Sequence, residues 1–271
     1  MTAGLNAAQK AAILAEALPY IQGLHGRTLV LRLAGSVVSD AALRAGMATD
    51  VSLLQLVGIH LVLVHDAGDR PADAAALSAA NQAIVAEINR RGGKAVGLNG
   101  LDGPLIRGVR GEGATALVDR VDPELIHLLK PRNFVPVIMP IASDPEGEPL
   151  LVAADVAAGR MAEALSAERL IVLADAVGVP DAQGEARPSL SLAEAQSLLD
   201  SGEALADDFR ARLNAVLTAL RGGVKSAQLT DGRIPGTLLL EVLSNAGVGS
   251  LIRSRTGPDF GADTLRYFAE S

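Results

Sequence analysis

The chain has no cysteine, no tryptophan and only 2% aromatic residues among its 271 residues. Without cysteine, neither disulfides nor thiolate metal sites can form. So few aromatic rings leave little surface on which nucleic-acid bases could stack. The formal net charge of −7 also argues against a basic face for phosphate backbones. The composition therefore disfavours nucleic acid as a partner.

The chain also lacks the patterns of a metal site and of a membrane protein. Its four histidines are scattered and show no close ligand spacing, so no metal site is expected. No apolar run approaches the roughly 20 residues that cross a bilayer. The amino terminus lacks the basic start and long apolar run of a secretory signal. These absences predict a cytoplasmic protein without a membrane partner.

Hydrophobic residues make up 49% of the chain, enough for a substantial core. Apolar, β-branched runs begin near residues 28, 60, 94, 135, 169 and 226, and helical patterns separate them. Such alternation predicts an α/β fold, a three-layer αβα sandwich around a mainly parallel central sheet. Pro19 predicts the end of the first helix near Leu18, and Ser191 with Glu194 predicts a capping box.

We expect one domain over residues 1–271, because no linker separates two units. A gradual division near residues 141–149 predicts an amino-terminal lobe of about residues 1–145 and a carboxy-terminal lobe of about residues 146–271. The first strand ends in Arg32-Leu-Ala-Gly35, and the second in His65-Asp-Ala-Gly-Asp69. Glycine turns after parallel strands are typical of anion sites in α/β enzymes.

Six stretches carry a family resemblance: residues 16–22, 88–98, 135–140, 220–225, 231–241 and 247–252. Together they resemble the amino-acid kinase family, and within it the acetylglutamate kinases. The resemblance implies transfer of the γ-phosphate of ATP, with Mg²⁺, to the side-chain carboxylate of N-acetylglutamate in arginine biosynthesis. It covers residues 10 to 252.

The resemblance also implies roles for individual residues. The two catalytic lysines of the family correspond to Arg32 and Arg212, and the acid that orients them corresponds to Asp155. Nucleotide-binding positions correspond to Gly35, Asp175 and Gly178. Substrate-binding positions correspond to Gly68 and Arg70.

The pattern departs from the family where chemistry is concentrated. Both lysines are arginines, whose planar forks do not replace ammonium point charges. Glycines of the second turn have become Asp66 and Ala67, and a carboxylate about 4 Å from a phosphate costs several kcal/mol at an effective dielectric near 20. The substrate lid is missing before Arg70. Two amides have become Leu151 and Ala153, and two further glycines are aspartates.

Two functions therefore remain open from the sequence. The chain is either an acetylglutamate kinase-like enzyme with an unusual arginine pair, or an inactive kinase-fold protein that acts as a binding or regulatory subunit. Simpler interpretations stay open too: a surface arginine at Arg32, a turn arginine at Arg70 and a helix-start acid at Asp155. The resemblance implies as partners N-acetylglutamate or a similar small acidic ligand, arginine as a second candidate ligand, and further copies in a homodimer or homohexamer.

Overall fold

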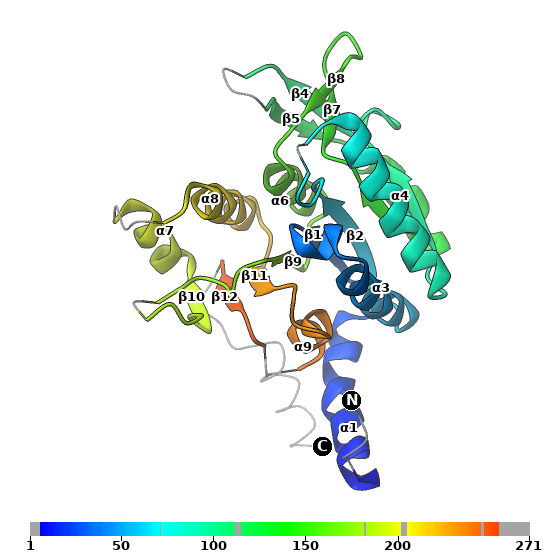
Figure 1. The fold of residues 1–271 in the computed structure, drawn as a ribbon, viewed down its shortest axis with the longest axis vertical. Coiled ribbons are helices and arrows are strands. Elements are labelled where there is room, and N and C mark those ends of the chain that lie inside the picture. Colours follow the sequence, from blue (N-terminus) through cyan, green and yellow to red (C-terminus); the bar gives the residue numbers. More distant parts are fainter. Residues whose placement is uncertain are drawn as a thin grey trace.

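The structure is a computed structural model that describes residues 6–70, 72–111, 115–181, 183–201, 205–244 and 247–254. An eight-stranded sheet has the order β10-β12-β11-β9-β1-β2-β6-β3 (Figure 1). Its strands are β1 (Thr28–Leu33), β2 (His60–His65), β3 (Ala95–Leu98), β6 (Val135–Ile138), β9 (Arg169–Ala174), β10 (Ser189–Ser191), β11 (Ser226–Asp231) and β12 (Ser250–Arg253). Neighbouring strands are parallel except for β11 and β12. The predicted mainly parallel α/β fold is confirmed.

A smaller sheet has the order β5-β4-β7-β8. Strands β4 (Ile106–Val109) and β5 (Leu117–Val121) form an antiparallel pair. The polar, glycine-rich sequence between Arg107 and Asp119 fits either a hairpin or a loop, and the structure has the hairpin. Strands β7 (Ile141–Ser143) and β8 (Pro149–Leu151) form a second antiparallel pair around the predicted turn at residues 144–148.

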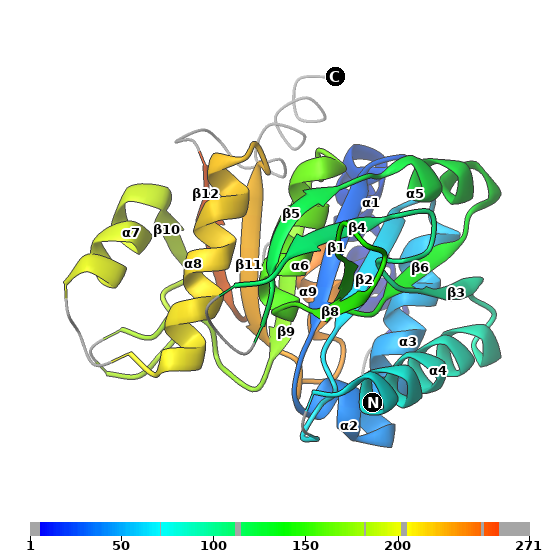
Figure 2. The same ribbon diagram turned by 90° about the horizontal axis from the view of Figure 1, so that it is seen from above.

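Helices cover both faces of the large sheet (Figures 1 and 2). Successive residues of β1 point to opposite faces: Leu29, Leu31 and Leu33 join one buried cluster, and Val30 joins the other. The helices are α1 (Ala7–Leu24), α2 (Ser36–Ser39), α3 (Ala41–Leu56), α4 (Ala74–Arg90), α5 (Glu124–Leu129), the 3₁₀ helix η1 (Lys130–Arg132), α6 (Ala154–Ala164), α7 (Leu192–Asp200), α8 (Asp207–Arg221) and α9 (Thr237–Leu243). Residues of α3, α4 and α9 pack into the first cluster, and residues of α6 and α8 into the second.

The end of the first helix was predicted wrongly. Helix α1 continues through Pro19 to Leu24, although proline removes one backbone hydrogen bond inside a helix. Pro19, Tyr20 and Leu24 are buried, and α1 packs against α9. Tertiary packing thus stabilises the turn that the local sequence disfavours. The predicted capping box of Ser191 and Glu194 is confirmed.

Parallel pairing brings three strand ends to one edge of the sheet. Leu33 at the end of β1 lies opposite His65 of β2 and Leu173 of β9. The turns after these strands contain Gly35, Asp66 and Asp175, and they lie together at this carboxyl-terminal edge, where Figure 2 also shows α2. The candidate site is built on this edge.

Candidate functional site

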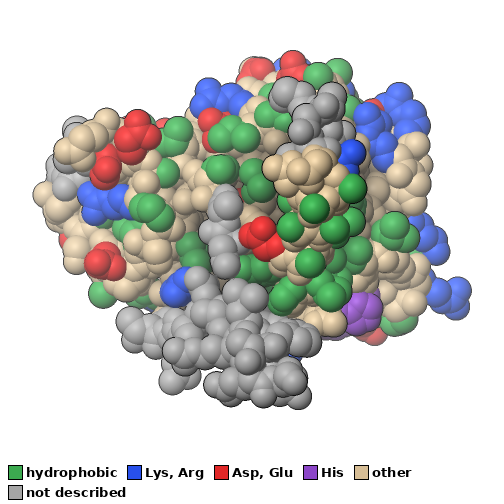
Figure 3. Space-filling view, turned by 90° about the horizontal axis from the view of Figure 1, so that it is seen from below, with side chains coloured by type: hydrophobic (Ala, Val, Ile, Leu, Met, Phe, Trp, Pro, Cys, Tyr) green, Lys and Arg blue, Asp and Glu red, His purple; other side chains and the backbone are tan. Residues whose placement is uncertain are grey.

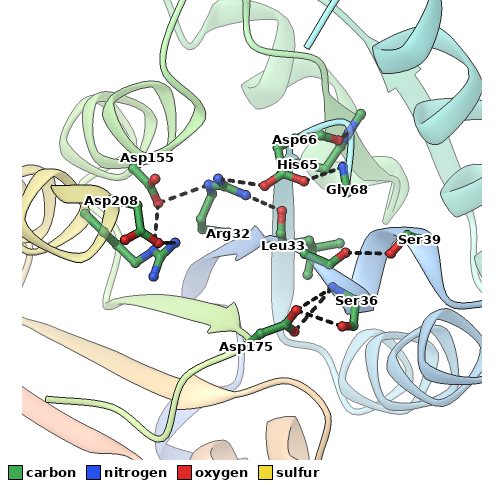
Figure 4. A network of polar contacts seen from close by, with 12 residues as sticks. Arg32, Leu33, Ser36, Ser39, His65, Asp66, Gly68, Asp155, Asp175 and Asp208 are labelled. Atoms are coloured by element: carbon green, nitrogen blue, oxygen red, sulfur yellow. Dashed lines mark hydrogen bonds and ion pairs between the residues drawn. The ribbon is translucent and has the colours of Figure 1, made fainter. Parts of the chain in front are cut away.

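Arg32 lies at the centre of the candidate site and is only 4% exposed. Its Nη2 lies 3.1 Å from Asp66 Oδ2, and its Nε lies 3.1 Å from Asp155 Oδ1 (Figure 4). Its Nη1 donates a hydrogen bond to the backbone carbonyl of Leu33. A buried guanidinium requires such partners, because an unpaired charge in the interior is costly.

Asp155 joins Arg32 to the second arginine. Asp155 lies in the first turn of α6, where the helix dipole favours a carboxylate. Its Oδ1 lies 3.6 Å from Nε of Arg212 on α8, whose Nη2 lies 3.9 Å from Asp208 Oδ2. The structure thus brings all three predicted catalytic positions together. Asp155 contacts both arginines through the same oxygen, Oδ1, so neither contact is a bidentate pair.

The site is a chain of alternating charges that runs Asp66, Arg32, Asp155, Arg212, Asp208. Two guanidiniums face three carboxylates, so the formal charge of this group is −1. Phosphoryl transfer requires positive charge and free hydrogen-bond donors around the moving phosphoryl group. Here protein carboxylates take up the charge of both arginines, and the sequence interpretation missed Asp66 and Asp208 as their partners.

The second turn is shaped around Asp66. Its Oδ1 accepts a hydrogen bond from the amide of Gly68 at 2.7 Å, so the predicted substrate-binding amide has an internal acceptor. His65 is fully buried, and its Nδ1 lies 2.7 Å from the Asp66 carbonyl while Asn81 Nδ2 lies 3.1 Å from its Nε2. Burial lowers the pKa of His65 to about 4, so the ring is neutral near pH 7.

In the first turn, which follows β1, a carboxylate of the protein also engages the hydrogen-bond donors. The Asp175 carboxylate accepts hydrogen bonds from the Ser36 amide at 3.1 Å and from the Ser36 hydroxyl at 2.7 Å (Figure 4). Gly35 has a φ of +56°, and a Cβ there would lie 2.6 Å from Asp175 Oδ2. Only glycine therefore fits this close contact between the ends of β1 and β9. Asp175, which the family resemblance assigns to nucleotide binding, is thus hydrogen-bonded to this turn.

The remaining predicted positions lie apart from the arginines. A Cβ at Gly178 would lie 2.6 Å from Ser250 Oγ, so this glycine is needed for packing against β12. Arg70 is exposed and donates from Nη2 to the carbonyl of Ala76 at 3.1 Å, as a turn arginine does. Within the described ranges, no group of three or more His, Asp or Glu side chains is placed to hold a metal ion.

The residues present do not fit the triphosphate of ATP. Asp66 engages Arg32, and Asp175 engages the Ser36 amide. Phosphate oxygens would need both of these donors at this edge. A phosphate placed there would also meet the Asp66 carboxylate, whose repulsion is unfavourable by several kcal/mol at about 4 Å and an effective dielectric near 20.

Comparison with known proteins identifies the fold and the ancestry. The family model described as the amino acid kinase family matches residues 27–231. The chain belongs to the amino acid kinase family. An acetylglutamate kinase from Chromobacterium violaceum is 37% identical, and the match covers 92% of this chain and 99% of that protein. The chain is thus acetylglutamate kinase-like in sequence over most of its length.

Solved structures support the same fold. N-acetylglutamate synthase from Neisseria gonorrhoeae, complexed with coenzyme A and N-acetyl-glutamate, superposes with a TM-score of 0.79 at 23% identity. The match covers 91% of this chain and 64% of that one, so the chain spans less than two thirds of the synthase. The same synthase complexed with coenzyme A and L-arginine gives a TM-score of 0.76 at 24% identity, covering 90% and 65%.

A second recess lies away from the arginine pair. It has a volume of about 240 Å³ and lies between α1, α9 and the β10–β12 strands. Glu241 lines it and is 3% exposed; its carboxylate accepts hydrogen bonds from the amides of Val248 and Gly249 and from Gln228 Nε2. Tyr20 and Glu241 both belong to stretches that carry the family resemblance, and this resemblance is the signal in the sequence that points to the recess.

Proposed function

We propose that this chain is an acetylglutamate kinase-like protein whose ATP-dependent phosphorylation of N-acetylglutamate is strongly impaired. The observation that carries the proposal is the ion pair of Arg32 with Asp66 at 3.1 Å, in a site where both arginines share Asp155. The kinase relatives imply ATP, with Mg²⁺, as the phosphoryl donor. The protein's own carboxylates compete with that donor for the same cations.

A turnover assay tests this proposal. The chain is incubated with ATP, Mg²⁺ and N-acetylglutamate, and the acyl phosphate is trapped with hydroxylamine, with the Chromobacterium violaceum enzyme assayed in parallel. Loss of one preorganised donor lowers kcat by about 10²–10³, so we expect turnover at least about a thousandfold below the control. Turnover of about 1–100 s⁻¹, the ordinary kinase range, would overturn the proposal.

A second candidate function is that of a binding or regulatory subunit. The recess at Glu241 favours it, because its wall combines a buried carboxylate with Tyr20, Arg169 and Arg253. A carboxylate beside arginine side chains suits a free amino acid that carries both charges, and arginine is the ligand that we propose. The Neisseria gonorrhoeae synthase of the same fold is described as complexed with L-arginine.

Calorimetry separates the two functions. Arginine binding by the wild type, weakened by Glu241→Gln and unchanged by Arg212→Ala, is the result expected of a regulatory ligand in this recess. Glu241→Gln keeps the shape and removes the charge, so it is the conservative test. Failure of arginine to bind would remove this second function and leave the first proposal intact.

Further features of the proposal concern the setting of the protein. We propose a cytoplasmic location; no helix in the described part of the chain is long and apolar enough to cross a membrane. The two lobes, of about residues 1–145 and 146–271, and assembly into a homodimer or homohexamer remain predictions.

A further inference from the structure

The amino-terminal edge of the large sheet lies opposite the candidate site. Strands β1 and β2 begin in register there, with Thr28 opposite His60, and β3 and β6 begin together, with Ala95 opposite Val135. Helix α5 lies toward this edge in Figure 2, whereas α2 lies at the other end. The loops that enter these four strands therefore form one continuous surface.

Basic side chains gather on this surface. They are His25, Arg27, His60, Lys94, Lys130 and Arg132, here called the amino-edge cluster. Among the described residues, none of the six forms an ion pair, whereas the nearby Arg90 and Arg91 both pair with Glu87. In Figure 3 a purple histidine and blue side chains lie along the lower right margin of the molecule.

The cluster is held in place by neutral partners. Lys130 Nζ donates to the Thr28 hydroxyl at 3.1 Å, and Lys94 Nζ donates to the Arg132 carbonyl at 3.0 Å. The same Lys94 ammonium lies 4.2 Å from the centre of the Phe134 ring. Neutral contacts orient these cations and leave their charge uncompensated.

The members are close enough to repel one another. The pKa of His60 is lowered, first by burial and then by the charges of Lys130 and His25. Glu168 lies next to Thr28, because its amide donates a hydrogen bond to the Thr28 carbonyl. Its carboxylate pairs with Lys225 at 2.8 Å, so its charge is already balanced by a cation outside the cluster. Like charges without counter-charges disfavour the compact state, and they raise the local concentration of anions. The chain as a whole carries a formal net charge of −7, so the amino-edge cluster is opposite in sign to the whole molecule.

Two exposed leucines flank the cluster. Leu56 is 85% exposed and precedes Val57, whose carbonyl lies 3.0 Å from His25 Nδ1; Leu128 is 67% exposed and precedes Lys130 by two residues. From this juxtaposition we propose that the amino-edge cluster, with Leu56 and Leu128, is the docking surface for an acidic protein segment that also supplies apolar side chains. The proposal is independent of catalysis and of the Glu241 recess.

A protein segment suits this surface better than a nucleic acid or a membrane. Exposed leucines match apolar side chains of a protein partner, whereas single-stranded nucleic acid needs aromatic stacking surfaces. Lys94 and Lys130 are fixed by hydrogen bonds, so they fit carboxylates at defined positions better than a fluid layer of lipid headgroups.

Fluorescence anisotropy tests the proposal on the whole chain. The probe is a labelled peptide of repeated Glu-Glu-Leu-Ser units, compared with a peptide in which every Glu is Gln, a single-stranded oligonucleotide, and phosphatidylserine vesicles. The reversal Arg27→Glu with Arg132→Glu is matched by Lys10→Glu with Arg107→Glu, which changes net charge equally with exposed cations elsewhere. We expect the first pair to weaken binding of the acidic peptide by about tenfold or more, and the second pair by less than about twofold.

A third variant tests the apolar part of the surface. Leu56→Ser with Leu128→Ser leaves all charges in place, and we expect it to weaken the acidic peptide while the weak binding of the oligonucleotide stays unchanged. Equal losses in the two charge reversals would overturn the proposal, because net charge alone would then explain them. Absence of peptide binding, or tighter binding of the oligonucleotide or vesicles through Arg27 and Arg132, would also overturn it.

Discussion

Asp66 engages two donor groups at the candidate site, and we expect it to limit which ligands bind there. One of its oxygens contacts Arg32 and the other accepts the Gly68 amide. Asp66→Asn removes the charge and keeps the size of the side chain. We expect it to bring binding of Mg²⁺ with a nonhydrolysable ATP analogue into the range that calorimetry measures, below about 1 mM, since a repulsive carboxylate is lost beside the phosphates.

The matched control for this change is Asp69→Asn. Asp69 lies in the same turn, but it contacts the Ser39 hydroxyl at 2.6 Å and not Arg32. If the two variants gain nucleotide affinity equally, general charge explains the result and the specific role of the Asp66–Arg32 pair is contradicted. Calorimetric titration of both variants under one buffer makes the comparison.

Two buried ionisable residues give opposite pH dependences of stability. Burial raises the pKa of Asp50 from 3.8 to about 6, so its contribution is lost as the pH rises through that range. Burial lowers the pKa of His65 from 6.5 to about 4, so its contribution is lost as the pH falls through that range. In the wild type the two slopes largely cancel between about pH 4 and pH 6.

The Asp50→Asn variant should show the rise of the unfolding free energy with pH that is due to His65. We expect the free energy of unfolding of this variant to rise by about 3 kcal/mol between about pH 4 and pH 6.5, because one pKa unit corresponds to about 1.4 kcal/mol. Urea denaturation at several pH values measures it. Parallel profiles for the variant and the wild type would show that Asp50 ionises normally in the folded protein.

At the scale of one element, helix α7 depends on its amino-terminal cap. Ser191 Oγ accepts the Glu194 amide, and the Glu194 carboxylate accepts the Ser191 amide at 2.7 Å. We expect Ser191→Ala to lower the free energy of unfolding by about 1 kcal/mol, since an amide at the helix start loses its acceptor. Ser189→Ala in the neighbouring strand is the control in the same denaturation series, and an equal loss there would contradict the capping role.

Strand positions and caps were predictable because they depend on local pattern. The apolar run that begins near residue 169 is the strand Arg169–Ala174, and the predicted Ser191–Glu194 capping box opens α7. Helix α1 passes Pro19 because of packing against α9, which no local pattern contains. Asp66 and Arg32 are 34 residues apart in the chain. The sequence therefore predicted that the Asp66 carboxylate would repel a phosphate, but it did not indicate that this carboxylate pairs with Arg32.

At the scale of the whole molecule, α1 extends from the body (Figure 1), and it carries exposed apolar side chains. Ile13, Leu14 and Leu18 are each at least half exposed. Single exposed apolar residues are common on protein surfaces, but a group of three on one helix indicates a contact surface. The predicted homodimer or homohexamer would give these residues a partner. We expect Leu14→Glu with Leu18→Glu to lower the mass measured by light scattering after size exclusion; an unchanged mass would exclude α1 from the interface.

The central claim is that the protein's own carboxylates block nucleotide binding at Arg32 and Arg212. Its most direct test is calorimetric titration of the wild type with Mg²⁺ and a nonhydrolysable ATP analogue. The arrangement of Asp66, Arg32, Asp155 and Arg212 predicts no measurable binding at concentrations up to about 1 mM, an affinity limit of about −4 kcal/mol. Micromolar nucleotide binding, together with turnover of N-acetylglutamate, would contradict it.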